Sequence, residues 1–365
     1  MSTSRALQMQ RPPPEVQYAE QLAKLARLDS APRPPGWTLS VNAARSFIVG
    51  DGALGIEGKV VAPVAAIERM LVTLATGRAL MLAGEPGTAK SMLSELLAAA
   101  ICGRSTLVVP GGAVISQEQL KYSWNYALML NARPSLRALV AGPLYQGMRD
   151  GQVVRLEDIT RAPPEVQEAL AGVLSERILQ VPELEGEQQL LYARDGFNII
   201  ATASSRDRGI GDMSAVLKRR FDFETVAPIR DFAHELALVE RTSARLLERS
   251  GVSQRVPAPI LDLLVSTFRD LRGCGAKGGV EGKDKLSAVM STAEAVHVAH
   301  AVGVRAWFLE QRPGNAADLV DCIAAIVLKD HADDRAKLRL YFEQRVAKRE
   351  GDHWRDFFNA RHRLP

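Results

Sequence analysis

The sequence predicts an α/β fold, in which a mostly parallel sheet lies between two layers of helices, followed by an all-helical domain. From about residue 59 to residue 230, strand patterns alternate with helical patterns, and this alternation is typical of a parallel sheet covered on both faces. A glycine-rich loop joins one of these strands to the next helix, and beyond residue 230 only helical patterns remain. We therefore expect an αβα core over residues 37–230 and a helical domain with a C-terminal tail over residues 231–365.

The first 36 residues are expected to form a flexible segment with one short helix. Residues 1–14 are polar and end in three prolines, a composition that buries too little apolar surface to become ordered by itself. Apolar residues then recur at helical spacing from Val16 to Leu28, and the prolines of residues 31–36 end the pattern. The apolar stripe of this helix needs a cover, which is either the main domain or a neighbouring subunit.

The remaining elements follow from the same patterns. In the core we expect helices over residues 59–75 and 91–101, and strands over 79–83, 105–109, 126–130, 153–156 and 197–202. Two short apolar runs around a glycine turn predict a β-hairpin over about residues 177–194. In the helical domain we expect helices over roughly 232–250, 257–272, 284–302, 315–330 and 333–350.

Composition excludes several classes of protein. Of the 365 residues, 47% are hydrophobic and 24% are charged, as in an ordinary globular chain. The net charge of +4 is spread along the chain, so it predicts no nucleic-acid partner. Cys102, Cys274 and Cys322 are far apart and odd in number, which indicates reduced thiols. Because no apolar run approaches about 18 residues, we expect no membrane span and a cytoplasmic location.

The strongest motif is a predicted phosphate-binding loop. The stretch GEPGTAKS follows a strand and opens a helix, which is the context that such a loop requires. Its backbone N–H groups and the helix N-terminus would face phosphates, Lys90 would reach the β and γ oxygens, and Ser91 would offer its hydroxyl to Mg²⁺. The alternative is a tight strand-to-helix turn with a chance Lys-Ser pair. The predicted binding residues are Gly84, Glu85, Pro86, Gly87, Thr88, Ala89, Lys90, Ser91 and Met92.

Ala89 stands where the usual form of this loop has glycine. A methyl group is tolerated there if the residue keeps a negative φ as the helix begins, so we expect a negative φ at Ala89.

Two acids end the strand that begins at Val153. Glu157 and Asp158 lie at the carboxyl end of a predicted buried strand, where α/β proteins bind their ligands. Because side chains alternate along a strand, the two acids point to opposite sides and have separate roles. We expect Glu157 on the Mg²⁺ side and Asp158 on the side that orients an attacking water. The usual order is Asp then Glu, and a misplacement of about 1 Å can cost on the order of a hundredfold in rate, so hydrolysis should be slow. Solvated acids after a strand are the alternative.

These motifs together resemble the MoxR-type AAA+ ATPases of the helix-2-insert clade. The resemblance runs from about residue 59 to residue 330 and includes the phosphate loop, LEDITRAPPEVQEALAGVLSER, FNIIATASSRDRGIGDMSAVLKRRFDF and the helical end. It implies a P-loop AAA+ core with a helical lid, a ring that is usually a hexamer, and ATP at the subunit interfaces. It also implies a β-hairpin inserted in the helix before the fourth core strand, and we assign this insert to residues 177–194.

The resemblance further implies roles for single residues. Ser204 matches the polar sensor position, which is commonly Asn, and its hydroxyl has a shorter reach. Arg220, with its neighbour Arg219, matches the arginine that is supplied to the γ-phosphate of the adjacent subunit, which can contribute about 10³ to 10⁵ in rate. The lid arginine of many relatives has no clear match, because Lys283-Asp284-Lys285 stand near that place.

Three further features have alternative interpretations. His297 and His300 indicate a packed helix face more than a zinc site. The loop of residues 206–209 could line a ring interface or be a solvated charged loop. The tail from His353 to Pro365 mixes aromatic and basic residues, which indicates docking on the lid or a neighbouring subunit more than nucleic-acid stacking.

Three functions are compatible with the sequence. The main hypothesis is a slow ATPase that remodels, or loads metal into, a partner protein; the resemblance implies a partner with a von Willebrand factor A domain. The second is a nucleotide-gated assembly module with negligible hydrolysis. The third, a nucleic-acid motor, is disfavoured by the modest charge.

Overall fold

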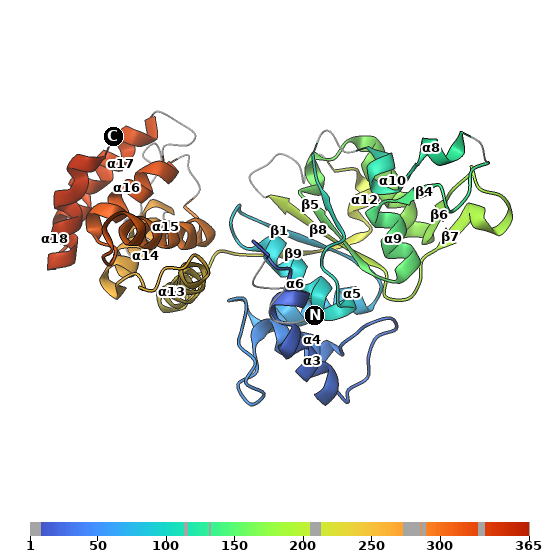
Figure 1. Cartoon of the computed structure of the whole chain (residues 1–365), viewed down its shortest axis with the longest axis horizontal. Coiled ribbons are helices and arrows are strands. Elements are labelled where there is room, and N and C mark those ends of the chain that lie inside the picture. Colours follow the sequence, from blue (N-terminus) through green and yellow to red (C-terminus); the bar gives the residue numbers. More distant parts are fainter. Residues whose placement is uncertain are drawn as a thin grey trace. The chain divides into compact units, whose positions relative to one another are not determined.

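The computed structural model describes residues 9–112, 116–130, 133–204, 213–272, 286, 290–327 and 333–364. The chain divides into two compact units, Met1–Glu85 with Ala89–Val226, and Pro86–Thr88 with Ala227–Pro365 (Figure 1). The division at residue 226 lies close to the boundary that the sequence predicts at residue 230.

A parallel sheet forms the centre of the first unit. Its described strands have the order β2-β5-β8-β1-β9, and every neighbouring pair is parallel. The strands are β1 (Ala79–Gly84), β2 (Val108–Pro110), β5 (Val153–Glu157), β8 (Asn198–Ser204) and β9 (Phe221–Thr225). The predicted mostly parallel sheet is therefore confirmed. The edge strand β9 was not predicted.

Alternate residues of the strands point into separate cores on the two faces of the sheet. Leu80 and Leu82 of β1 pack with helices on one face, whereas Ala79 and Met81 pack with helices on the other. The first face is covered by α4 (Val41–Val49), α5 (Val64–Ala75) and α6 (Lys90–Cys102), and the second by α9 (Pro143–Asp150) and α10 (Pro164–Glu176) (Figure 1). This is the three-layer αβα arrangement, and α4, α9 and α10 are not among the helices whose ranges the sequence patterns predicted.

Two antiparallel hairpins extend from the second face. One pairs β6 (Ile178–Gln180) with β7 (Leu190–Tyr192) and confirms the hairpin predicted over residues 177–194. The other pairs β3 (Tyr122–Trp124) with β4 (Leu139–Ala141), and between them lies α8 (Tyr126–Met129). The strand expected over residues 126–130 is therefore wrong. A short apolar run without alternation fits either a strand or a helical turn, so composition could not decide between them.

The described N-terminal residues pack against the core. Helices α2 (Pro14–Gln17) and α3 (Ala19–Leu28) precede α4, and Leu25 is 2% exposed within the core that α4, α5 and α6 share. The Glu15 carboxylate accepts hydrogen bonds from the N–H (3.0 Å) and Oγ (2.7 Å) of Ser105. Residues 9–36 are therefore packed rather than flexible, and of the two covers expected for the apolar stripe of the short helix, the main domain of the same chain provides it.

The second unit is helical. Its described helices are α13 (Phe232–Arg249), α14 (Ala258–Arg272), α15 (Thr292–Glu310), α16 (Ala316–Val327), α17 (Asp333–Gln344) and α18 (Asp352–Asn359). They surround one apolar core, in which Trp354 and Phe357 of α18 are buried. The tail therefore docks on the helical unit, as one of the two expectations had it. No helix among the described residues is long and apolar enough to cross a membrane.

The two histidines of α15 differ: His300 packs against the end of α13, whereas His297 is exposed. His300 Nε2 lies 2.8 Å from Ser250 Oγ at the end of α13, and burial together with the nearby His297 lowers the pKa of His300. In the described part of the chain, no group of His, Cys, Asp and Glu side chains could hold a metal ion. The packed helix face that the sequence favoured is therefore confirmed for His300 and wrong for His297.

Candidate nucleotide-binding site

The predicted phosphate loop connects β1 to α6. Gly87 has a φ of 75°, and Ala89, the residue before the helix, has φ 65° and ψ 25°. The expected negative φ at Ala89 is therefore wrong: this alanine adopts the left-handed conformation that glycine adopts without strain. Such a conformation costs a residue with a Cβ atom about 1–2 kcal/mol. The loop therefore keeps the backbone conformation expected with glycine at position 89, although Ala89 carries a methyl group.

Lys90 and Ser91 begin α6 directly after this turn. The Lys90 side chain is 8% exposed, and its ammonium donates to the carbonyl oxygens of Gly84 (3.0 Å) and Glu85 (2.7 Å). The lysine therefore lies along the loop whose backbone it would help to present to a phosphate chain. Ser91 and Met92 lie at the exposed start of the helix.

The Glu157 carboxylate joins the strand end to the loop. Its Oε2 accepts hydrogen bonds from Ser91 Oγ (2.5 Å) and Thr202 Oγ1 (2.9 Å). Its Oε1 accepts from Ser94 Oγ (3.1 Å) and Arg155 Nη2 (2.6 Å). Glu157 and Ser91 together therefore present hard oxygen donors in one place, which is the chemistry that Mg²⁺ prefers.

The surroundings of Glu157 determine its charge. Burial raises its pKa, but the hydrogen bond from Ser91, the positive charge of Arg155 and the hydrogen bond from Thr202 outweigh burial and hold the pKa below its ordinary value. Glu157 is therefore ionised at neutral pH.

Asp158 differs from Glu157 in backbone and in contacts. It has a φ of 49°, and its N–H donates to Thr202 Oγ1 (3.0 Å). In the part of the chain that the structure describes, its carboxylate makes no hydrogen bond or ion pair, whereas that of Glu157 makes four. The two acids thus have different partners, as expected, but strand alternation is not the reason, because β5 ends at Glu157 and Asp158 follows it in the left-handed conformation.

Three residues at this site were missed by the sequence patterns. Arg155 is 4% exposed and lies in the middle of β5. Thr202 of β8 connects Glu157 to the backbone of Asp158. Gly111 donates its N–H to the Glu157 carbonyl, and any side chain there would collide with the carbonyl oxygens of Glu157 and Asp158. The available signal was Arg155, because a charge within an otherwise apolar buried strand needs a partner.

The other predicted site residues lie at two ends of the sheet. Ser204 ends β8 and lies in register with Gly84, at the start of the phosphate loop. Arg219 and Arg220 are exposed and precede β9, whose first residue pairs with the first residue of β1. Since a strand advances about 3.3 Å per residue, these arginines lie roughly 15–20 Å from the loop of their own chain. The structure therefore brings Ser204 to the loop and does not bring Arg219 or Arg220 there.

The lysines of residues 283–285 and the loop of residues 206–209 lie outside the described residues.

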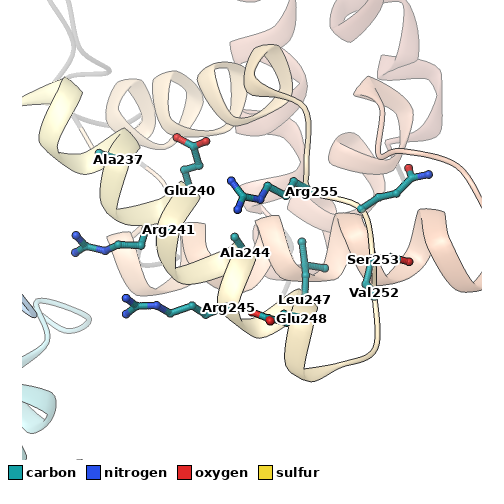
Figure 2. Close-up of a pocket in the computed structure, with 11 residues that line it drawn as sticks. Ala237, Glu240, Arg241, Ala244, Arg245, Leu247, Glu248, Val252, Ser253 and Arg255 are labelled. Carbon is teal, nitrogen blue, oxygen red and sulfur yellow. The ribbon is translucent and has the colours of Figure 1, made fainter. Parts of the chain in front are cut away.

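Within the second unit, a hollow of about 530 Å³ lies between α13 and the segment that follows it (Figure 2). Charged side chains of both signs line it, among them Glu240, Arg245 and Arg255, and none of the predicted site residues belongs to it.

Two family models match most of the chain. Residues 79–221 match the AAA domain of the dynein-related subfamily, and residues 233–365 match the C-terminal domain of YehL-like AAA+ ATPases. YehL of Escherichia coli (strain K12) is 62% identical over 357 residues, which cover 98% of both chains. YojN of Bacillus subtilis (strain 168) is 24% identical over 156 residues, or 41% of this chain and 48% of that protein.

Solved structures support the fold alone. A crystal structure of NtrX from Brucella abortus superposes with a TM-score of 0.50 and 12% sequence identity, covering 82% of this chain and 62% of that chain. The model of the YehL-like C-terminal domain matches the helical unit, which contains neither the phosphate loop nor the two acids.

Proposed function

Because the chain belongs to the YehL-like family of AAA+ ATPases, we propose that it binds ATP with Mg²⁺ at the loop from Gly84 to Ser91 and hydrolyses the ATP slowly. One contact carries this proposal: Ser91 Oγ donates to Glu157 Oε2 at 2.5 Å, so the loop and the acid-bearing strand end meet at the same point. An ionised carboxylate beside a loop hydroxyl is the oxygen pair that would hold Mg²⁺.

Each residue has a separate role in this proposal. Lys90 and the loop N–H groups bind the phosphates, and Ser91 and Glu157 hold the metal ion. Mg²⁺, when bound, would neutralise phosphate charge. Asp158, whose carboxylate is not engaged by the described residues, orients the attacking water. Turnover is slow because Asp158 is one methylene shorter than the glutamate usual at that position.

We further propose that the protein acts on a partner protein, as the MoxR-type resemblance implies. The insert of residues 122–141 supports a polypeptide partner, because it exposes large apolar side chains: Tyr126 is 72% exposed and Leu130 is 81% exposed. A ring, most simply a hexamer, would supply Arg220 to the neighbouring site. A partner with a von Willebrand factor A domain, remodelling or metal loading of that partner, and a cytoplasmic location stay predictions.

Replacing Asp158 tests hydrolysis separately from binding. Asp158→Asn keeps the shape of the side chain and removes its basicity, so we expect steady-state phosphate release to fall about a hundredfold or more, with ATP affinity within about threefold of the parent. Asp352→Asn, at an exposed carboxylate of α18, is the matched control and should leave both values unchanged.

Two outcomes would change the proposal. An Asp158→Asn variant that releases phosphate at the parental rate contradicts the role of Asp158. A parent that binds ATP tightly and has no turnover above the variant favours the nucleotide-gated assembly module.

A further inference from the structure

Arg155 is a buried charge in the centre of β5. Its guanidinium has partners on every side: Nε donates to Ser94 Oγ (2.8 Å), Nη1 to the Ser105 carbonyl (2.9 Å) and Nη2 to Glu157 Oε1 (2.6 Å). Nη2 also lies 3.4 Å from Glu95 Oε1. Arg155 therefore links β5 to the helix that follows the phosphate loop and to the segment that leads into β2.

The two oxygens of the Glu157 carboxylate have different hydrogen-bond partners, and Arg155 contacts only one of them. Oε1 is held by Arg155 and by Ser94, which itself accepts from Arg155, whereas Oε2 accepts from Ser91 and from Thr202 of β8. Glutamate is one methylene longer than the aspartate usual at this position and has one more rotatable bond. The contacts on Oε1 remove that extra freedom and leave Oε2 against the loop hydroxyl.

Two residues of the N-terminal segment contact partners of Arg155. Arg11 donates to both oxygens of Glu95 (2.9 and 3.0 Å), and Glu15 accepts from the N–H and Oγ of Ser105. Glu95 and Ser105 are both partners of Arg155. A chain of polar contacts thus runs from residues 11–15 through Arg155 to the carboxylate beside the phosphate loop.

We propose that Arg155 is a positioning residue, which fixes the long Glu157 side chain so that one of its oxygens is available to Mg²⁺ at Ser91. This inference rests on the proposed function, because it assigns Arg155 to the metal ion of that site. Two effects oppose each other: the positive charge disfavours a cation nearby, and the orientation of Glu157 favours it. The orientation of Glu157 dominates.

The test measures how the affinity for a fluorescent ATP analogue depends on Mg²⁺ concentration. Partners of metal ligands typically contribute about 10–100-fold to metal affinity, so we expect Arg155→Met to raise the half-maximal Mg²⁺ concentration about tenfold or more. Nucleotide affinity in EDTA should stay within about threefold of the parent. Arg149→Met, the same change at an exposed arginine of the same unit, is the control.

Two further variants keep the test decisive. If Arg155→Met does not fold, Ser94→Ala removes the hydroxyl between Arg155 and Glu157 with little change in volume, and a several-fold rise in the half-maximal Mg²⁺ concentration is expected. In a Glu157→Asp background, adding Arg155→Met should have less than a third of its effect in the parent, because the shorter side chain no longer needs the contact.

The outcomes separate this inference from the proposed function. If Arg155→Met or Ser94→Ala leaves the Mg²⁺ dependence unchanged, or lowers the half-maximal Mg²⁺ concentration, the positioning role is wrong. A full effect of Arg155→Met in the Glu157→Asp background also overturns it. If the parent binds no nucleotide at any Mg²⁺ concentration, the proposed function itself fails.

Discussion

At the scale of single residues, the site brings together side chains that are far apart in the sequence. Arg155 and Glu157 are two positions apart on one strand, but Ser91, Ser94 and Thr202 reach the same carboxylate from other elements. The phosphate loop and the acids could be predicted, because each is a local pattern. Thr202 and Gly111 could not, because their contacts arise only when separate strands become neighbours in the sheet.

Ala89 provides a prediction at this scale. Ala89→Gly removes about 1–2 kcal/mol of left-handed strain, and the greater chain entropy of the unfolded glycine variant offsets about 0.4–1 kcal/mol of this, so the free energy of unfolding should rise by up to about 1.5 kcal/mol. Chemical denaturation measures it. Ala98→Gly, in the regular part of α6, is the matched control and should lower the free energy of unfolding by about 1 kcal/mol or more. Equal losses in both variants would show that Ala89 carries no strain.

At the scale of elements, the parallel strands determine where the site forms. β1, β5 and β8 are adjacent and end at the same edge of the sheet, so the phosphate loop, the acids and Ser204 are brought to one edge. The alternation of strand and helix patterns along the sequence made this sheet predictable. The short helix α8 was not predictable from its own segment. The cover of the N-terminal helix was predicted only as a choice between the main domain and a neighbouring subunit, because contacts such as that of Glu15 with Ser105 lie outside that segment.

Glu15 provides a prediction at this scale. Glu15→Ala removes both hydrogen bonds to Ser105, and a hydrogen bond to a charged group contributes about 1.5–3 kcal/mol. The amides of α2 and α3 should then exchange with deuterium about tenfold faster or more, while those of β8 keep their protection. Glu20→Ala, at an exposed carboxylate of α3, serves as the control. Unchanged exchange in Glu15→Ala would show that this contact does not hold the N-terminal helices.

At the scale of the whole molecule, the proposed ring would place a second copy of the chain beside each site. Arg219 and Arg220 lie near the amino ends of the strands, whereas the phosphate loop lies at their carboxyl ends. They therefore do not serve the site of their own chain. An arginine supplied by a neighbour would make turnover depend on assembly. This role rests on the resemblance, and the strand register shows only that the two arginines lie away from the phosphate loop of their own chain.

The most direct measurement is steady-state phosphate release at saturating Mg²⁺-ATP over a range of protein concentrations, with Lys90→Ala as the blank and Arg220→Ala as a second variant. The account predicts a rate per subunit that rises with concentration in the parent, none above background in Lys90→Ala, and a fall of about a hundredfold or more in Arg220→Ala. Phosphate release by Lys90→Ala at the parental rate would contradict the assignment of the site.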